Sequence, residues 1–141
     1  MTLTEAVQYV SQRFVYKTDK YLLLDHWSVM PEEDGKMYGD CDDFSTTVLW
    51  LLCDRSLLKF IWNVFILHRY KLWRVYDSKG ELHVVGSVGD MFFDNWTLAA
   101  MPKQQFLAVT KHTLKFAYPS FMFLFPMLLG YLVRGSKGAI M

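Results

Sequence analysis

Cysteine is scarce in this sequence, and its scarcity excludes several kinds of small protein. The 141 residues include two cysteines, Cys41 and Cys53. Two cysteines cannot build a disulfide framework, and this usage suits a reducing compartment. On one helix the two would lie roughly 18 Å apart, whereas a disulfide needs Cα atoms within about 7 Å. We interpret Cys53 as a buried structural thiol.

An excess of one charge and a leader segment are also missing. The chain carries 15 Lys and Arg against 14 Asp and Glu, a net charge of +1, which gives no electrostatic reason to expect a nucleic-acid partner. The opening "MTLTEAVQYVSQRF" lacks the basic n-region and the apolar h-region of a signal peptide, so we expect synthesis in the cytoplasm. We find no internal repeat and no low-complexity tract.

Apolar and aromatic residues, by contrast, are plentiful. The hydrophobic fraction is 52%, with five Trp, eight Tyr and eleven Phe. This composition provides ample material for a packed core, and the length fits one domain.

The first part of the chain predicts two helices separated by a loop. "TLTE" offers a capping box between Thr2 and Glu5, and Val7, Val10 and Phe14 follow near helical spacing. Proline, glycine and acidic residues break any period over 29–40, which predicts a loop.

A second helix is expected to begin at Cys41, because apolar residues from Phe44 to Leu52 recur on one helical face. We predict that it runs to about Leu58. From there β-branched and aromatic residues predict strands over 60–70 and 71–77.

The middle of the chain then predicts an antiparallel meander. "DSKGE" reads as a hairpin turn in which Gly80 takes a positive φ, and further strands are expected over 82–88 and 91–96. Helices followed by a meander indicate an α+β fold.

Residues 116–133 contain no charged side chain. As a helix this segment would span about 27 Å, close to the roughly 30 Å of a bilayer core. The pattern predicts a membrane-inserting or membrane-contacting segment. A helix docked on a partner protein and a helix in the chain's own core are the alternatives.

Three residues could form a catalytic set. Cys41 at a helix N-terminus would meet unpaired backbone N–H groups and the positive end of the helix dipole, which lower a thiol pKa. His83 and Asp94 would approach each other if 82–88 and 91–96 pair as neighbouring strands. The order Cys, His, Asp is the papain-type arrangement. His68 and His112 have no motif around them, and we expect both to be structural or solvated.

The residues around this set carry a resemblance. "DHWSVMPEEDGKMYGDCDDFS", over 25–45, resembles the bacterial transglutaminase-like cysteine peptidases, in which an aromatic D-Y-W-type stretch and a Pro-Glu loop precede G-D-C-[DE]-D-[YF]. The family's histidine opens an H-x-V strand, matched by His83 in "HVV". Its acid lies in a D-N pair, matched by Asp94 and Asn95. The resemblance covers roughly 7–98.

The resemblance implies a papain-like core over 1–98 and a C-terminal extension over 99–141. It makes Cys41 the nucleophile, His83 the base and Asp94 the residue that orients His83. The backbone N–H of Cys41 is a plausible oxyanion donor.

Three upstream side chains are candidates for a second oxyanion or substrate-positioning group, and the sequence does not choose among Tyr38, His26 and Trp27. Asn95 is expected to serve the turn.

The aspartates beside Cys41 have two interpretations. Asp40 would be an N-cap, with acidic residues of the first turn complementing the helix dipole. Some members of the family hold calcium through residues at the positions of Asp40 and Asp42, and oxygen ligands suit Ca²⁺. A zinc site made by Cys41 and His83 fails on ligand number.

The expected function is a cysteine peptidase or amidase acting on a peptide or protein, with no required cofactor beyond possible calcium. Small size, the absence of a signal peptide and an apolar tail also resemble the small internal virion proteins of short-tailed phages. The alternatives are a catalytically silent structural or membrane-engaging virion protein on the same core and a transglutaminase-like acyl transferase.

Overall fold

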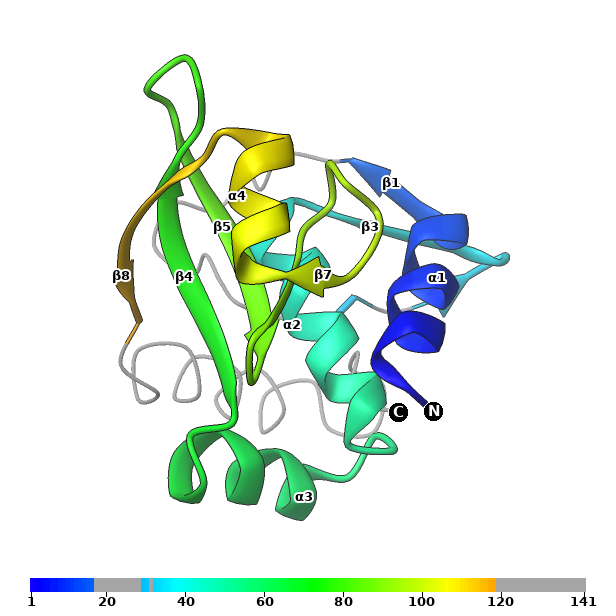
Figure 1. Ribbon diagram of the computed structural model, residues 1–141. Helices are drawn as coiled ribbons and strands as arrows, with labels where there is room; N and C mark the ends of the chain where they lie inside the picture. The colour runs from blue at the N-terminus through cyan, green and yellow to red at the C-terminus, as the bar shows by residue number, and fades with distance from the viewer. Residues whose placement is uncertain (17–28, 31, 119–141) are drawn as a thin grey trace, which may run out of the picture.

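The computed structural model describes residues 1–16, 29–30 and 32–118, which form a mixed α+β fold (Figure 1). The helices are α1 (Leu3–Arg13), α2 (Cys41–Leu52), α3 (Leu57–Ile61), the π-helical η1 (Trp62–Ile66) and α4 (Lys103–Thr110). The strands are β1 (Phe14–Tyr16), β2 (Glu32–Glu33), β3 (Lys36–Gly39), β4 (Tyr70–Tyr76), β5 (Leu82–Val88), β6 (Met91–Phe93), β7 (Met101–Pro102) and β8 (Thr113–Ala117). None of the helices in this part of the chain is both long and apolar enough to cross a membrane.

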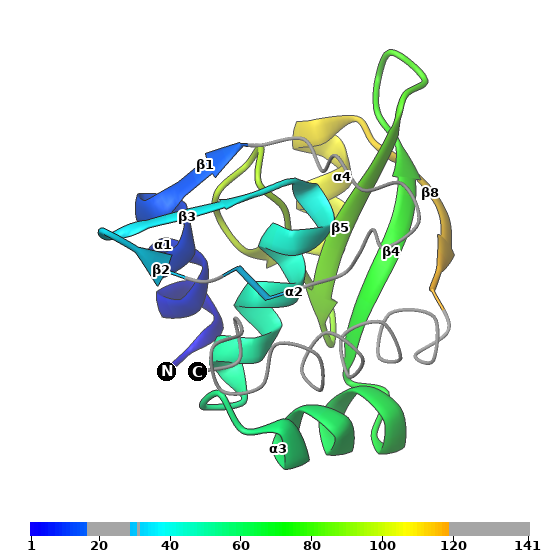
Figure 2. The same ribbon diagram turned by 180° about the vertical axis from the view of Figure 1, so that it is seen from behind.

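A five-stranded antiparallel sheet organises the described residues in the order β7-β6-β5-β4-β8. Helices α2 and α4 cover its opposite faces, as Figures 1 and 2 show from the two sides. The larger core lies on the α2 face and includes Leu72 and Phe93 of the sheet. The smaller core lies on the α4 face and includes Val85 and Phe106. Successive strand residues point to opposite faces, so one sheet contributes to both cores.

The predicted first helix is confirmed, with one correction at its end. Thr2 and Glu5 form the expected capping box, and Val7 and Val10 are buried. Phe14 does not continue the helix, because it adopts an extended backbone and begins β1.

The loop predicted over 29–40 is wrong for most of its length. β2 and β3 pair as a hairpin, and β3 also pairs in parallel with β1. Asp34 and Gly35 both have positive φ, at 53° and 75°, as a two-residue hairpin turn requires.

The helix predicted from Cys41 to Leu58 is divided in two. α2 ends at Leu52, and Asp54 and Arg55 then adopt φ values of 54° and 57°. Ser56 caps α3 by accepting a hydrogen bond from the backbone N–H of Lys59 at 3.3 Å.

The strand predicted over 60–70 is wrong, because residues up to Ile66 are helical. Phe60 and Val64 lie four residues apart and are both fully buried, so helical spacing places them on one inward face. Burial of this face outweighs the strand preference of the residue types.

The meander is confirmed in its main part. β4 and β5 pair from Tyr70↔Val88 to Tyr76↔Leu82, and Gly80 in the turn has a φ of 82°. The third strand is shorter than predicted, because β6 ends at Phe93.

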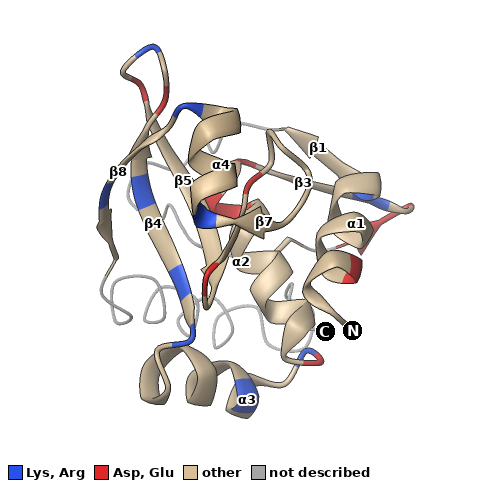
Figure 3. Ribbon diagram, viewed as in Figure 1, with Lys and Arg blue, Asp and Glu red and all other residues tan. Residues whose placement is uncertain are grey.

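The segment after residue 98 adds β7, α4 and β8 to the same sheet and cores. β8 pairs with β4, and the backbone N–H of Tyr118 donates to Leu72 O at 2.8 Å. Phe116 and Ala117, the first residues of the apolar segment, therefore lie in a strand rather than a helix. Residues 119–133 of this segment lie outside the described residues. Figure 3 shows that basic residues lie on β4, β8 and α3 rather than on a single element.

Candidate active site

Cys41 is the first residue of α2, as predicted. Asp40 is the N-cap: its carboxylate accepts from the backbone N–H of Asp43 at 3.3 Å, and Asp43 accepts from the backbone N–H of Asp40 at 3.3 Å. A Cβ at Gly39 would lie 2.8 Å from the Cβ of Asp43 and 2.8 Å from the sulfur of Met30. The GDCDD sequence therefore forms a tightly packed helix start, which confirms the N-cap prediction for Asp40.

The surroundings of Cys41 disfavour a free thiolate. Burial, with further effects from the carboxylates of Asp40 and Asp43, raises the pKa of the Cys41 thiol to about 12. The opposing contributions are hydrogen bonds from the backbone N–H groups of Val84 and of Cys41 itself. Val84 follows His83 on β5, so the sulfur contacts the backbone of the strand that carries the candidate base. Within the described residues no hydrogen bond joins Cys41 to His83.

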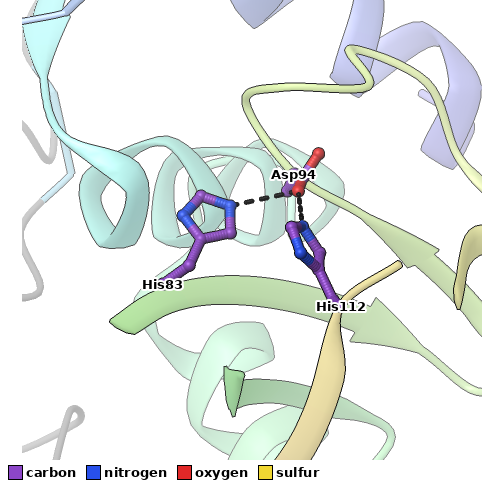
Figure 4. Close-up of side chains that lie close together, drawn as sticks. All are labelled: His83, Asp94 and His112. Carbon is purple, nitrogen blue, oxygen red and sulfur yellow. Dashed lines mark hydrogen bonds and ion pairs between the residues drawn. The ribbon is translucent and has the colours of Figure 1, made fainter. Parts of the chain in front are cut away.

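His83 and Asp94 do meet, as predicted. His83 lies on β5, and Asp94 directly follows β6 at the end of the neighbouring strand. The Nε2 atom of His83 and the Oδ2 atom of Asp94 are 3.0 Å apart, and both residues are buried. The Nδ1 atom of His83 points away from Asp94 (Figure 4). This geometry leaves Nδ1 available as a base.

The backbone of the β5–β6 hairpin depends on a glycine opposite an aromatic ring. Gly86 pairs with Phe93, and a Cβ at Gly86 would lie 2.4 Å from the ring atom Cζ of Phe93. Only a residue without a side chain fits there, because the ring occupies the space of the Cβ. Phe93 immediately precedes Asp94, so this packing also holds the start of the turn that carries the carboxylate.

The carboxylate of Asp94 accepts hydrogen bonds at both oxygens. Oδ1 accepts from the backbone N–H of Trp96 at 3.1 Å, and from the backbone N–H and the hydroxyl of Thr97 at 2.8 and 2.9 Å. Oδ2 accepts from His83 and from His112. Burial alone would raise the pKa of Asp94, but the hydrogen bonds from His112, His83 and Thr97 together hold it well below its usual range.

His112 is a member of this cluster that the sequence interpretation left out. Its Nε2 atom lies 3.0 Å from Oδ2 of Asp94, and its side chain has no exposed surface. Residue 112 lies between α4 and β8, outside the stretch that resembles the peptidase family. Pairing of β8 with β4 brings it to Asp94. No local motif marks it, because this placement depends on long-range strand pairing.

Trp96 covers the imidazole of His83. The two rings stack with centroids 4.3 Å apart and planes inclined by 23°. Trp96 is 53% exposed whereas His83 is 4% exposed, so the indole lies between the imidazole and solvent. Exclusion of water strengthens the hydrogen bond between His83 and Asp94.

The oxyanion candidates are only partly placed. Tyr38 lies on β3 and is 40% exposed, whereas His26 and Trp27 lie outside the described residues. Tyr118 was not foreseen: burial raises the pKa of its hydroxyl, and the nearby Cys41 adds to that shift. The Oδ1 atom of Asn95, in the turn, is buried without a hydrogen-bond partner among the described residues.

Among the described residues, two groups of side chains have the spacing of metal ligands. Each has ligand atoms within 4.8 Å of one another, and they are the carboxylates of Asp40, Asp42 and Asp43 and the set His83, Asp94 and His112. In the second group the Nδ1 atom of His112 is buried without a partner, whereas a metal-bound histidine usually donates from its other nitrogen. Hydrogen bonds account for that group without an ion.

Comparison with known proteins identifies no relative. No protein-family model matches the chain, and a search of curated proteins found no match. The function is therefore argued from the chemistry of these residues.

Proposed function

We propose that the chain is a thiol hydrolase of the cysteine-peptidase type, with a papain-like core, that cleaves a peptide bond through Cys41, His83 and Asp94. The observation that supports it most is the buried hydrogen bond of 3.0 Å between His83 and Asp94. The sulfur of Cys41, at the N-terminus of α2, accepts a hydrogen bond from the backbone N–H of Val84, so the cysteine contacts the strand that carries His83. A nucleophile, a base and an orienting carboxylate are the parts that such chemistry needs.

The first chemical step is acylation. Asp94 accepts from Nε2–H of His83, which leaves a lone pair on Nδ1. Nδ1 takes the proton of Cys41, Sγ attacks the carbonyl carbon, and the electron pair of the carbonyl moves to its oxygen. The backbone N–H of Cys41 would donate to that oxyanion. The intermediate then collapses, the C–N bond breaks and Nδ1–H of the imidazolium protonates the leaving amine.

The second step releases the acyl group. Nδ1 of His83 removes a proton from water, whose oxygen attacks the thioester carbon. The C–S bond breaks, and the proton returns from His83 to Sγ. An amine in place of water gives the acyl transferase by the same steps, so the nature of the acceptor decides between the two activities.

The resting state of Cys41 sets a requirement on this mechanism. A thiol whose pKa is raised to about 12 is protonated at neutral pH. Proton transfer to His83 must therefore accompany the attack. The sulfur must also turn from the backbone of Val84 towards Nδ1 of His83.

Alkylation with iodoacetamide across pH tests the proposal. The parent for this experiment carries Cys53→Ala, which removes the second thiol, and its control carries His83→Ala as well. We expect Cys41 to react below pH 7 in the parent and to lose that reactivity in the control, because the imidazole of His83 must take the thiol proton as the sulfur attacks the reagent. Equal profiles in the two proteins, each with a midpoint at or above pH 8.5, would sink the enzymatic function.

The second candidate is a structural or membrane-engaging protein on the same core. Two observations favour it: the raised pKa of Cys41 and an apolar surface on α3 and η1. Leu58 is 79% exposed and Trp62 54% exposed there, and Phe65, Ile66 and Leu67 are exposed with them. Exposed aromatic and aliphatic side chains on one helical face suit a membrane interface or a partner protein.

Association with a phage virion, suggested by the size and the apolar tail, is part of both proposals. Sedimentation with lipid vesicles tests the membrane part, with Trp62→Ser as the variant. Binding that is lost in Trp62→Ser favours membrane engagement, whereas no binding of either protein counts against it.

A further inference from the structure

His112 brings a second imidazole to the carboxylate that orients His83. We propose that His112 is a positioning residue, which donates from Nε2 to Oδ2 of Asp94 and holds that carboxylate ionised and oriented for His83. Its catalytic meaning rests on the proposed function. The arrangement of protons, however, can be tested without any activity.

The hydrogen bonds determine where the protons lie. Oδ2 of Asp94 is an acceptor, and the Nε2 atoms of His83 and His112 each lie 3.0 Å from it. Each Nε2 must therefore carry a hydrogen, which assigns the tautomer of both rings. The Nδ1 atom of His112 is buried and has no hydrogen-bond partner in the part of the chain that the structure describes. A proton on Nδ1 would leave a buried N–H without a partner. It would also make His112 a cation, in addition to the imidazolium that forms on His83 during the reaction, and both effects are costly.

It follows that His112 is a neutral donor. The carboxylate keeps a single negative charge, and that charge faces the imidazolium that forms on His83 when it takes the thiol proton. A second donor on Oδ2 also makes transfer of a proton from His83 to Asp94 less favourable. The lowered pKa of Asp94 fits this arrangement, because the hydrogen bond from His112 contributes to it.

The surroundings of His112 limit its movement. Lys111 ends α4 with a left-handed φ of 61°, and the backbone N–H of His112 donates to the hydroxyl of Thr110 at 3.2 Å. The ring lies against Phe106 and Trp96, with centroids 5.7 and 5.2 Å away. An apolar residue would fill this space at lower desolvation cost, so the placement of a polar ring calls for a role at Asp94.

One further carboxylate lies near both rings. The pKa of Asp77, in the β4–β5 turn, is lowered mainly by hydrogen bonds from the backbone of Glu81 and Lys79, with smaller effects from His112 and His83. Any pH profile of the site therefore includes Asp77 as well as the two histidines and Asp94. Asp77→Asn serves as the control for its contribution.

Nitrogen NMR of the full chain labelled with ¹⁵N-histidine tests the arrangement directly. We expect proton-bearing Nε2 atoms in both His83 and His112 near pH 7, with slowly exchanging protons that shift in Asp94→Asn. The His112→Gln variant identifies the signal of residue 112. A proton on Nδ1 of His112 overturns the proposal, and so does an Nε2 without a proton, as a bound metal would require.

Alkylation of Cys41 by iodoacetamide tests the positioning role, in the Cys53→Ala background. Gln and Asn at position 112 form a matched pair, because the amide of Gln can reach Oδ2 of Asp94 in place of Nε2 whereas the shorter Asn cannot. We expect His112→Asn to lower the rate at pH 6 by about 10- to 100-fold, the equivalent of one hydrogen bond to a charged group. His112→Gln should stay within about threefold of the parent.

The outcomes distinguish the positioning role of His112 from the proposed hydrolase function. An activated Cys41 in the parent, with equal rates in the Gln and Asn variants at equal melting temperatures, overturns the positioning role alone. A parent whose Cys41 reacts as an ordinary thiol overturns the proposed function, and the positioning role with it. The NMR result then still decides whether His112 holds Asp94.

Discussion

Replacement of Asp94 by Asn changes the residue that accepts hydrogen bonds from His83, His112, Trp96 and Thr97. The carboxylate accepts at both oxygens, whereas an amide has one accepting oxygen and one NH₂ group. Either orientation of the Asn side chain therefore places its NH₂ against groups that donate. In one orientation these are His83 and His112, and in the other they are the backbone and hydroxyl donors of Trp96 and Thr97.

The expected loss of stability follows from these contacts. Two hydrogen bonds to a buried charge contribute about 1.5–3 kcal/mol each, so the gross loss is roughly 3–6 kcal/mol. Solvent screening gives no reduction, because Asp94 is fully buried. The imidazole of His83 can recover part of the loss by moving its proton to Nδ1 and accepting from the amide, whereas a proton moved to the buried Nδ1 of His112 would meet no partner among the described residues. We therefore expect Asp94→Asn to lower the free energy of unfolding by about 2–4 kcal/mol near pH 6.

The pH dependence provides the sharper measurement. The pKa of Asp94 is lowered in the folded chain, so the carboxylate stabilises the fold above its unfolded value of about 3.9 and loses this contribution as the pH falls below it. Urea unfolding at pH 6, 5, 4 and 3 should show the difference between parent and Asp94→Asn shrinking towards pH 3.

Asp77→Asn is the control for this measurement. Asp77→Asn should cost less, because both backbone N–H donors, from Lys79 and Glu81, bond one oxygen, Oδ1, which the amide retains. A difference between parent and Asp94→Asn that stays constant from pH 6 to pH 3 would contradict an ionised Asp94 held by the two imidazoles.

Three further predictions concern the helix start and the hairpin. Gly86→Ala should lower the free energy of unfolding, measured in urea, by about 1–3 kcal/mol, because its Cβ meets the ring of Phe93. Adding Phe93→Leu to the same chain should recover part of that loss. If the losses of the two single variants simply add in the double variant, the contact is contradicted. Asp40→Asn keeps a capping side chain but removes a charge that raises the pKa of Cys41, so the alkylation profile should move to lower pH with little change in melting temperature. If calcium binds at Asp40 and Asp42, Ca²⁺ at about 1 mM, on the order of the affinity of an extracellular site, should raise the melting temperature of the parent. The same addition should leave the melting temperature of Asp42→Asn unchanged. No rise in the parent argues against the site.

Local signals predicted the parts of the fold that local chemistry determines. The start of α2 follows from a capping aspartate, and the β4–β5 hairpin follows from a turn glycine between alternating strands. The hairpin of β2 and β3 was missed although Asp34 and Gly35 form a strong turn signal. The acidic and proline residues around that pair were interpreted as a loop instead.

The errors and omissions have a common physical origin in long-range packing. Residues 60–66 have the composition of a strand, yet burial of Phe60 and Val64 makes them helical. His83 and Asp94 were predicted together because consecutive strands usually pair. His112 was not, because β8 pairs with β4 rather than with a strand close to it in sequence.

The pairing of β8 with β4 has a consequence for the time at which the site forms during synthesis. His112 follows Asp94 by 18 residues (112 − 94), which the ribosome adds over roughly 1–4 s at about 5–20 residues per second. Until β8 leaves the exit tunnel and joins β4, Asp94 has one imidazole instead of two. A nascent chain would therefore carry Cys41, His83 and Asp94 without the clamp from His112. Under the proposed function, Cys41 in a chain still attached to the ribosome would react about 10- to 100-fold more slowly than in the finished fold.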